Sequence, residues 1–473
     1  MPAIARRLTL ESLRWSAHQL VMRFGLGELS FSTVYWYPDV DLLDLDRRFG
    51  RDFMERVHLH SALFESNKLA SLRPEILDLG PYARHHTAAL ERLWCEVFQR
   101  IWAQWRYEND LPDASPPQWA TRPVASGLGA VRRDRHADEV LLFCGGGKDS
   151  LVTMKLLERA GIPFASFGYA TNAYGLVRPQ LGLIDALLDH GVPRRRERQI
   201  VFDDFVDAPV LSLYGESIGV RTITTAETPS SVFGSLPILL ARGYPLAALG
   251  HEASANRGNL VWDRTGEEVN HQWGKSVEAE RLLDEYVRSE LVADIGVFSL
   301  LMPIHDVVIF SLLRRDASAL RATHSCNEDK PWCRRCPKCA YVWLGYRAHL
   351  ERAPVEAMFP EDLLEVHENQ PIVRDLLGLG SHLPFECVGH VEESRLALAL
   401  CRARGLLGPG GLTLAERLPP LELSAMLERY LRVDAEHSRL PASIAAGVLP
   451  QMREAAEEAR TRILAQLGRE RTP

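Results

Sequence analysis

The sequence predicts an α/β protein built on a doubly wound parallel sheet, in which helices cover both faces of the strands. Two observations support this fold class. Between residues 138 and 350, short apolar runs alternate with longer segments whose apolar residues have helical spacing. Polar clusters at residues 145–150, 169–172 and 251–256 follow three of the apolar runs. Such clusters are expected where parallel strands end, because ligands of open α/β sheets bind at the carboxyl ends of strands.

The expected elements follow one another through this central region. The first strand ends in the glycines of "CGGGKDS", and Gly161 is expected to close the helix that comes next. Strands are expected at residues 139–147, 162–170, 196–205 and 245–256, and helices at residues 150–161, 181–191, 231–244 and 276–291.

The flanking regions have a different character. Residues 90–109 predict a partly buried helix whose tryptophans pack in the core rather than stack on a ligand. The Pro- and Ser-rich residues 111–127 predict a linker, and the residues after 350 are mostly of helical pattern. We therefore expect an N-terminal substrate-recognition or accessory domain (1–130), a central α/β domain (131–350) and a mainly helical C-terminal domain (351–473).

The composition excludes some classes of protein. The 473 residues are 46% hydrophobic, yet no apolar run reaches the roughly 18 residues of a membrane helix, and the first residues lack the apolar block of a secretory signal. We therefore expect a cytoplasmic protein. The net charge of -7 weighs against extensive nucleic-acid binding. The basic run "RRRER" at residues 194–198 is interpreted as a solvated turn before a strand, with a local nucleic-acid patch as the alternative.

The strand, glycine-rich turn and helix start at residues 139–150 together predict an anion site. Glycines let the backbone approach a ligand, and the free amides and dipole at a helix start favour phosphate. Ser150 can cap the helix or donate to a phosphate oxygen, and Lys148 would offset further negative charge. Asp149 would repel a bare phosphate, so an accompanying Mg²⁺ is expected. The spacing fits neither GxxxxGK[ST] nor GxGxxG, and a glycine-rich turn without a ligand is the alternative.

The loop resembles the SGGxDS motif, or PP-loop, of the ATP pyrophosphatase superfamily. The matching residues are Gly146, Gly147, Asp149 and Ser150. Gly145 stands where that family usually has serine, so the backbone of the loop must do more of the binding. The resemblance implies a HUP-like α/β fold for residues 131–350, cleavage of ATP to AMP and pyrophosphate, and adenylation of a carboxyl or carbonyl oxygen. It also implies that the end of the second strand, at Tyr169, lies near the adenosine.

Cys326, Cys333, Cys336 and Cys339 form a C-x6-C-x2-C-x2-C cluster. Four thiolates can complete a tetrahedral zinc site, and the basic residues between them would offset their charge. Buried structural thiols are one alternative, and an Fe–S cluster is another. The layout resembles the queuosine-precursor nitrile synthases, which are PP-loop enzymes with a four-cysteine zinc site after the last strand. This resemblance covers about residues 138–345 and leaves both flanks unexplained.

Several stretches resemble a narrower family. The GGGKDS loop, "TTAETPSS" (224–231), "GHEASANRGN" (250–259) and "WCRRCPKCAYVWLG" (332–345) are similar to the UDP-N-acetylmuramoyl-L-alanyl-L-glutamate epimerases. The resemblance implies that ATP and Mg²⁺ are used to invert the terminal L-Glu of UDP-MurNAc-L-Ala-L-Glu to D-Glu for peptidoglycan synthesis. AMP and pyrophosphate would be released. It also implies functional coupling to the ligase that adds L-Glu to UDP-MurNAc-L-Ala.

Inversion at Cα needs an acid and a base with tuned pKa values. The candidates are His251 and Glu252, which directly follow a strand, and Glu227 and His271. Each has a plainer interpretation: Glu227 as a helix cap, His251 as a hydrogen-bonded loop residue and His271 as a surface residue.

Other polar residues are candidates for substrate binding. Asn256, Arg257 and Asn259 could bind carboxylate or sugar–phosphate oxygens. The segment "CVGHVEESR" (387–395) is interpreted as a helix N-terminus with acidic first-turn residues. Its alternative is that the tail reaches over the ATP site and supplies an acid or base.

Two further function classes stay open. One is a PP-loop ligase or an enzyme that modifies tRNA or a nucleobase, which the cysteines and the basic run favour and the acidic balance opposes. The other is a nucleotide-sensing or scaffold protein without catalysis. The glycine at position 145 favours this class, whereas the retained Lys148, Asp149 and Ser150 oppose it.

Overall fold

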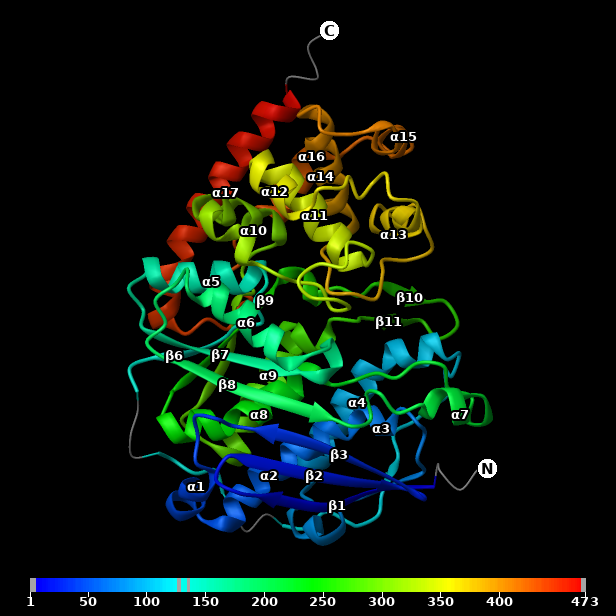
Figure 1. Cartoon of the computed structure of the whole chain (residues 1–473), viewed down its shortest axis with the longest axis vertical. Coiled ribbons are helices and arrows are strands. Elements are labelled where there is room, and N and C mark those ends of the chain that lie inside the picture. Colours follow the sequence, from blue (N-terminus) through cyan, green and yellow to red (C-terminus); the bar gives the residue numbers. More distant parts are fainter. Residues whose placement is uncertain (1–5, 126–128, 134–136, 469–473) are drawn as a thin grey trace.

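In the part of the chain that the computed structural model describes, residues 6–125, 129–133 and 137–468, one ten-stranded sheet runs through the molecule (Figure 1). Its order is β12 (Gly296–Leu301), β9 (Leu246–Glu252), β6 (Val140–Phe143), β7 (Phe164–Thr171), β8 (Arg196–Asp203), β3 (Leu29–Trp36), β2 (Gln19–Leu26), β1 (Arg7–Trp15), β4 (Ile76–Asp78) and β5 (Gln118–Trp119). A separate antiparallel pair is formed by β10 (Leu260–Trp262) and β11 (Glu267–Val269).

The helices fall into three stretches of the chain. The N-terminal region holds α1 (Leu42–Phe49), α2 (Arg51–Glu65), α3 (Asn67–Ala70) and α4 (Ala88–Glu108). The central region holds α5 (Lys148–Arg159), α6 (Val177–Leu188), α7 (Val210–Ile218), α8 (Glu227–Arg242), α9 (Val277–Tyr286), α10 (Asp306–Leu313) and α11 (Pro337–His349). The remainder are α12 (Arg352–Met358), α13 (Gln370–Leu376), α14 (Val391–Ala403), α15 (Pro409–Glu416), α16 (Leu423–Tyr430) and α17 (Ala442–Leu467). Among all of these described helices, none has both the length and the apolar character needed to cross a bilayer.

In the half of the sheet from β12 to β8, the sequence predicts β6, β7, β8 and β9, whereas β12 is not among the expected strands. The chain alternates β6, α5, β7, α6, β8, α8, β9, α9 and β12, and neighbouring strands of this half pair in parallel. The α/β class with a largely parallel sheet is therefore confirmed. Gly161 directly follows α5 and its C-cap with a left-handed φ of 67°, a conformation that ends helices and that glycine adopts without strain.

The N-terminal strands extend this same sheet. β3 pairs antiparallel with β8, with Thr33 opposite Asp203 and Trp36 opposite Ile200. The division into three domains stays a prediction, but its first boundary is crossed by a continuous sheet. Within the predicted linker, Gln118–Trp119 form β5 beside β4, and residues 126 and 127 lie outside the described residues.

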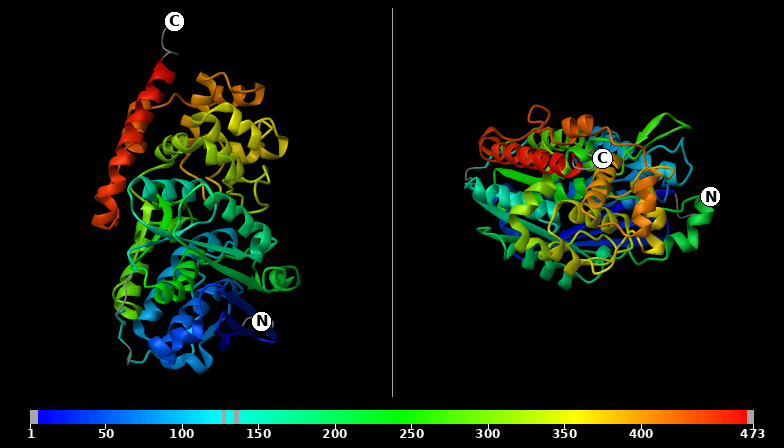
Figure 2. Two further views of the ribbon diagram at one scale, coloured as in Figure 1. Left: turned by 60° about the vertical axis from the view of Figure 1, so that its left-hand side comes forward. Right: turned by 90° about the horizontal axis from the view of Figure 1, so that it is seen from above.

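Hydrophobic cores lie on both faces of the sheet, since successive residues of a strand point to opposite faces. Leu141 of β6 belongs to a core that includes residues of α2, α4, α8 and α9, whereas Leu142 belongs to a core that includes residues of α5, α10, α11, α14 and α17. Trp94, Trp102 and Trp105 of α4 are at most 2% exposed, which confirms their predicted core packing. Figure 2 shows α17 lying along one side of the C-terminal helices, at the opposite end of the molecule from β1, β2 and β3.

Candidate functional site

The glycine loop between β6 and α5 can be built only with glycine at its centre. Gly146 has a φ of 87°, and a Cβ atom on it would lie 2.0 Å from Nε2 of His324. A Cβ on Gly147 would lie 2.8 Å from Oγ of Ser325. Around Gly145, by contrast, no atom of the described chain lies within 4 Å of such a Cβ. The departure from the usual serine at position 145 is therefore not forced by space.

The loop leads directly into a helix whose first amides are available to a ligand. Gly147 is the N-cap of α5, and no described side chain caps it. The first amides of a helix have no partner within the helix and favour an anion. Asp149 lies in the first turn, and Ser150 is 7% exposed.

A cavity of about 240 Å³ lies against the loop. Its walls come from the carboxyl ends of β6, β7 and β9, as expected for a parallel sheet, and from later segments that fold over them. The lining residues include Gly145, Gly147, Asp149, Ser150, Tyr169, Tyr174, Glu227, His251, Lys275, His324, Lys330, Lys338 and Cys387.

Lys148 is not among these lining residues. Its ammonium is buried, with Nζ 2.6 Å from Oδ1 of Asp149 and 2.5 Å from Oδ1 of Asp306. Burial alone would lower the pKa of Lys148, but the two carboxylates raise it above its ordinary value. Its charge is thus already paired inside the protein, where the sequence suggested that it would offset a bound anion.

Three other lysines, unlike Lys148, line the cavity itself. Lys275, Lys330 and Lys338 line the cavity, two of them from the cysteine-rich segment and one from the turn before α9. Their place at the cavity is not predicted from the sequence, although Lys338 lies within the cysteine motif. Only their position in the fold distinguishes them from surface lysines.

Glu227 lies in the first turn of α8, on the cavity wall. The hydroxyl groups of Tyr169 and Tyr174 both donate to its Oε1 atom, from Tyr174 at 3.2 Å. Burial and the Glu227 carboxylate raise the pKa of Tyr169 well above its ordinary value. Because Ala226 is the N-cap, Glu227 is not the helix cap of the plainer interpretation.

His251 and Glu252 are consecutive residues of β9 and therefore lie on opposite sides. His251 lines the cavity, where burial and Lys275 lower its pKa to about 3. Glu252 lies outside the lining, where its Oε2 accepts from the amide of Ser254 at 2.7 Å. Burial, with the nearby Asp306, raises the pKa of Glu252 well above its ordinary value. The two side chains thus do not line the same cavity.

His271 does not line the cavity. Its Nδ1 lies 2.8 Å from Oε1 of Gln104, and its Nε2 lies 4.0 Å from Sγ of Cys387. Cys387 itself lines the cavity. The segment at residues 387–395 therefore forms the predicted helix N-terminus and also reaches the cavity, whereas a role for it as an acid or base stays a prediction. Its second half begins α14 with Glu392 and Glu393 in the first turn, and its first residue reaches the glycine-loop cavity.

The predicted substrate-binding residues lie apart from this cavity. Asn256 and Arg257 line a second cavity of about 730 Å³, together with Arg429 and Arg432. The amide of Asn259 donates to the carbonyl oxygen of Pro384 at 2.7 Å, so this side chain holds a loop in place.

A larger cavity of about 580 Å³ adjoins the glycine-loop cavity, and both are lined by Tyr169, Tyr174, Glu227 and Ser231. The N-terminal region supplies part of its wall, including Tyr35 and Lys68. Lys68 is paired with Glu65 at 2.8 Å and with Asp203 at 2.5 Å. The N-terminal region therefore contributes directly to the space next to the loop.

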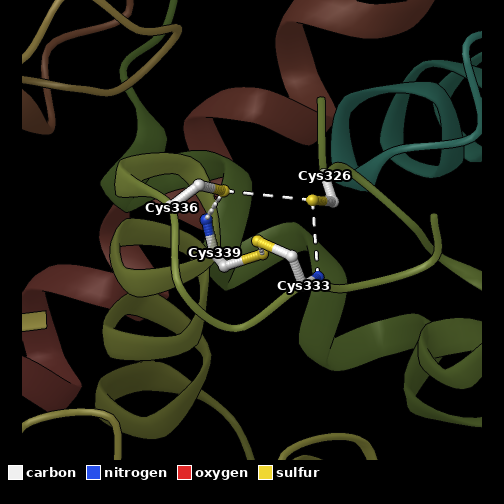
Figure 3. Close-up of side chains that lie close together, drawn as sticks. All are labelled: Cys326, Cys333, Cys336 and Cys339. Atoms are coloured by element: carbon white, nitrogen blue, oxygen red, sulfur yellow. Dashed lines mark hydrogen bonds between the residues drawn. The ribbon is translucent and has the colours of Figure 1, made fainter. Parts of the chain in front are cut away.

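The four clustered cysteines face one another (Figure 3). The Sγ atoms of Cys326 and Cys336 are 3.9 Å apart, and those of Cys333 and Cys339 are 3.8 Å apart. A tetrahedral site with Zn–S bonds of about 2.3 Å has sulfur–sulfur edges of about 3.8 Å, so the arrangement fits zinc. Backbone amides also donate to the sulfurs, for example from Cys333 to Sγ of Cys326 at 3.4 Å.

Comparison with known proteins finds similarity to one family. A model of the MurL N-terminal domain matches residues 235–300, and a model of the MurL C-terminal domain matches residues 317–405. UDP-N-acetyl-alpha-D-muramoyl-L-alanyl-L-glutamate epimerases of Micromonospora sp. and Salinispora tropica are 32% and 31% identical to it, each over 64% of this chain. The enzyme of that name from Xanthomonas oryzae pv. oryzae is 28% identical over 56% of the chain.

The matched part spans 66%, 64% and 57% of the length of these three relatives, which is less than two thirds in each case. Both MurL models nevertheless fall on residues that build the cavity. His251 and Lys275 lie within the first match, and the segment from His324 to Cys387 lies within the second. Over these residues the chain is similar to the MurL family.

Proposed function

We propose that this chain is an enzyme that inverts the terminal L-Glu of UDP-MurNAc-L-Ala-L-Glu to D-Glu in peptidoglycan synthesis, with ATP as co-substrate. The observation that carries the proposal is that both MurL domain matches fall on residues of the glycine-loop cavity. A ligase that adds L-Glu to UDP-MurNAc-L-Ala would supply the substrate. Use of ATP is consistent with a cytoplasmic location, which we also propose.

The loop and its surroundings support binding of ATP in the manner of the PP-loop superfamily. Lys275, Lys330 and Lys338 offer positive charge around the free amides of α5. His324 is 1% exposed and borders the loop, and both of its ring nitrogens lack a hydrogen-bond partner among the described residues. An unpaired buried polar group is costly, so a ligand oxygen at this position would stabilise the site. The adjoining cavity of about 580 Å³ supplies room for more than the phosphates.

The residues also fit Mg²⁺ and zinc. Asp149 is a carboxylate on the cavity wall beside the loop: its Oδ1 pairs with Lys148, and its other oxygen would hold Mg²⁺, a metal that prefers oxygen ligands. When bound, Mg²⁺ would neutralise phosphate charge that Asp149 otherwise repels. The four cysteines would hold a structural zinc ion. Their segment carries Lys330 and Lys338, so the cluster would fix both lysines at the cavity.

Adenylation explains why ATP is needed for an inversion. The α-proton beside a free carboxylate is very weakly acidic, because its removal places a second negative charge next to the first. Transfer of AMP to the carboxylate removes that charge and leaves an ester-like carbonyl. The proton is then removed more readily and returns on the other face, and hydrolysis of the adenylate releases AMP and leaves D-Glu at the end of the dipeptide.

The test uses the full chain with ATP, Mg²⁺ and UDP-MurNAc-L-Ala-L-Glu in D₂O. We expect release of pyrophosphate and one deuterium at Cα of the glutamate, in a product that contains D-Glu. Omission of ATP, and use of UDP-MurNAc-L-Ala, are the controls. Absence of both deuterium and D-Glu at saturating ligand would contradict the proposal.

The alternative of a tRNA-modifying enzyme loses one of its supports. The basic run at residues 194–198 is engaged with carboxylates of the surrounding surface. Arg194, Arg196 and Arg198 each form an ion pair with a nearby aspartate, at 2.9, 2.7 and 3.0 Å. Its charge is therefore largely compensated, and we propose no nucleic-acid substrate.

A further inference from the structure

We propose that Cys387 is the base that removes the α-proton of the activated glutamate. This inference rests on the proposed function and assigns a residue to its proton-transfer step. It comes from the position of the thiol, which a loop between α13 and α14 brings over the glycine-loop cavity. Asp149, Lys275 and Cys387 thus line one space although they are far apart in the chain.

The thiol is held in place from several sides. Nζ of Lys275 donates to Sγ of Cys387 at 2.8 Å. The ammonium of Lys338 donates to the carbonyl oxygen of Cys387 and fixes the backbone there. Nε2 of His271, which does not line the cavity, lies 4.0 Å from the sulfur. A base must be fixed relative to Cα, and these contacts provide that fixation.

The charges around the sulfur favour the thiolate. The titratable groups facing it are Lys275, Lys338, His271, Tyr174 and Glu386. Burial alone would raise the pKa of the Cys387 thiol, but Lys275, His271 and Lys338 bring it down to about 6. At neutral pH the sulfur is then mostly ionised, and a thiolate near its own pKa is an effective general base.

The other candidates on the cavity wall are less suited to this role. His251 remains neutral, but with a pKa of about 3 it is too weak a base. Glu227 already accepts two tyrosine hydroxyls on its Oε1 atom. Glu252 does not line the cavity, and burial with the nearby Asp306 raises its pKa well above its ordinary value.

Proton transfer by Cys387 balances in a simple way. The Cα–H bond breaks, an S–H bond forms, and the electron pair moves into the activated carbonyl as an enolate. A proton from a solvent-exchanging donor on the opposite face then forms the new Cα–H bond. The thiol returns its proton to solvent, so that one proton leaves and one arrives in each turnover.

The nearby side chains suggest one competing role for the thiol, as a metal ligand. His271, Glu386 and Cys387 each offer a ligand atom, and these atoms lie within 4.8 Å of one another. The Lys275 ammonium already donates to the sulfur at 2.8 Å, and its positive charge would repel a metal cation bound to the same sulfur. The structure therefore favours a thiolate–ammonium pair over a metal ligand.

The decisive experiment separates adenylation from proton transfer. With Cys387→Ser in the assay above, we expect pyrophosphate release to persist within about tenfold, while deuterium entry at Cα falls at least about 100-fold. The matched control is Cys95→Ser, a half-buried cysteine of α4 outside the cavity, which should keep both activities. Deuterium entry within threefold of wild type in Cys387→Ser would overturn the inference and leave the proposed function intact. Absence of deuterium in the wild type would overturn both.

A second measurement covers the case in which Cys387→Ser does not fold. Alkylation of wild-type Cys387 by iodoacetamide, followed by mass spectrometry of its peptide, should show a midpoint near pH 6. Lys275→Met should move that midpoint upward by at least one pH unit. A wild-type midpoint near 9, or alkylation only after treatment with a chelator, would overturn the inference.

Discussion

Nζ of Lys148 lies 2.5 Å from Oδ1 of Asp306, and this contact joins the start of α5 to the start of α10. The hydroxyl of Tyr341 donates to the other oxygen of Asp306 at 2.7 Å. Although burial alone would raise the pKa of Asp306, Lys148 holds it below its ordinary value. The lysine of the glycine loop is therefore part of the buried frame of the site.

Replacement of Lys148 by methionine should destabilise the protein. The substitution leaves the buried Asp306 carboxylate without its cation, which costs about 3–5 kcal/mol in comparable cases. Urea denaturation followed by tryptophan fluorescence measures the loss. The double variant Lys148→Met, Asp306→Asn should recover part of it, because the unpaired charge is gone. Wild-type stability in Lys148→Met with loss of ATP binding would instead place the ammonium on a phosphate.

The glycines of the loop should differ in their tolerance of side chains. Gly146→Ala should lower the free energy of unfolding by at least about 2 kcal/mol, because its Cβ would overlap His324 at a left-handed φ. Gly145→Ser should change it by less than about 0.5 kcal/mol, since the space there is open. Thermal denaturation of the two variants checks the order, and equal effects would contradict this account of the loop.

The cysteine cluster should bind one zinc ion per chain. Purification after growth with zinc, followed by elemental analysis, should give a ratio near one, and Cys339→Ser should reduce it. Cys95→Ser serves as the control and should keep the metal. Removal of zinc should also weaken ATP binding, because Lys330 and Lys338 would lose their anchor. Four freely reactive thiols in a metal-free, fully folded chain would contradict the proposed zinc site.

Because of Glu393, the free energy of unfolding should fall as the pH rises. Burial and Asp306 raise its pKa from 4.5 to about 8, so between these values the native state holds a proton that the unfolded chain has released. The contribution of this group to stability should therefore be full below about pH 4.5, fall between pH 4.5 and pH 8 and then level off.

Glu393→Gln tests this pH dependence. The amide keeps an acceptor for Ser254 and for the amide of His390, which both donate to Oε2 at 3.0 Å. Urea midpoints at pH 5.5, 6.5, 7.5 and 8.5 should decline less steeply in the variant. Glu392→Gln is the control, because Arg257 and backbone contacts lower the pKa of Glu392 despite its burial. An unchanged slope in Glu393→Gln would show that the carboxyl is ionised in the native state.

The sequence predicts those parts of the fold that depend on neighbouring residues. Hydrophobic periodicity locates the central strands and helices, and Gly161 marks the end of the helix before it. The continuation of the sheet through β3 is not predicted, because the pairing of Thr33 with Asp203 joins segments about 170 residues apart. Periodicity within a segment carries no information about such a partner.

The same distinction applies to the site. The motif at residues 145–150 predicts the loop, but it gives no indication that Lys148 is paired with Asp306, 158 positions away. Cys387 appears in the sequence only as part of a segment with two interpretations. Its contact with Lys275 depends on the course of the chain between α13 and α14, for which the sequence offers no pattern.

The contact between Lys275 and Cys387 also gives the cavity a reactive group that a drug-like molecule can use. A fragment that fits the apolar space beside Tyr169 and Tyr174, extended by a mild electrophile such as an acrylamide, would meet an ionised sulfur in the adjoining cavity. Covalent capture of this kind discriminates by reactivity as well as by shape. Ordinary surface thiols, which are mostly protonated at neutral pH, would react more slowly.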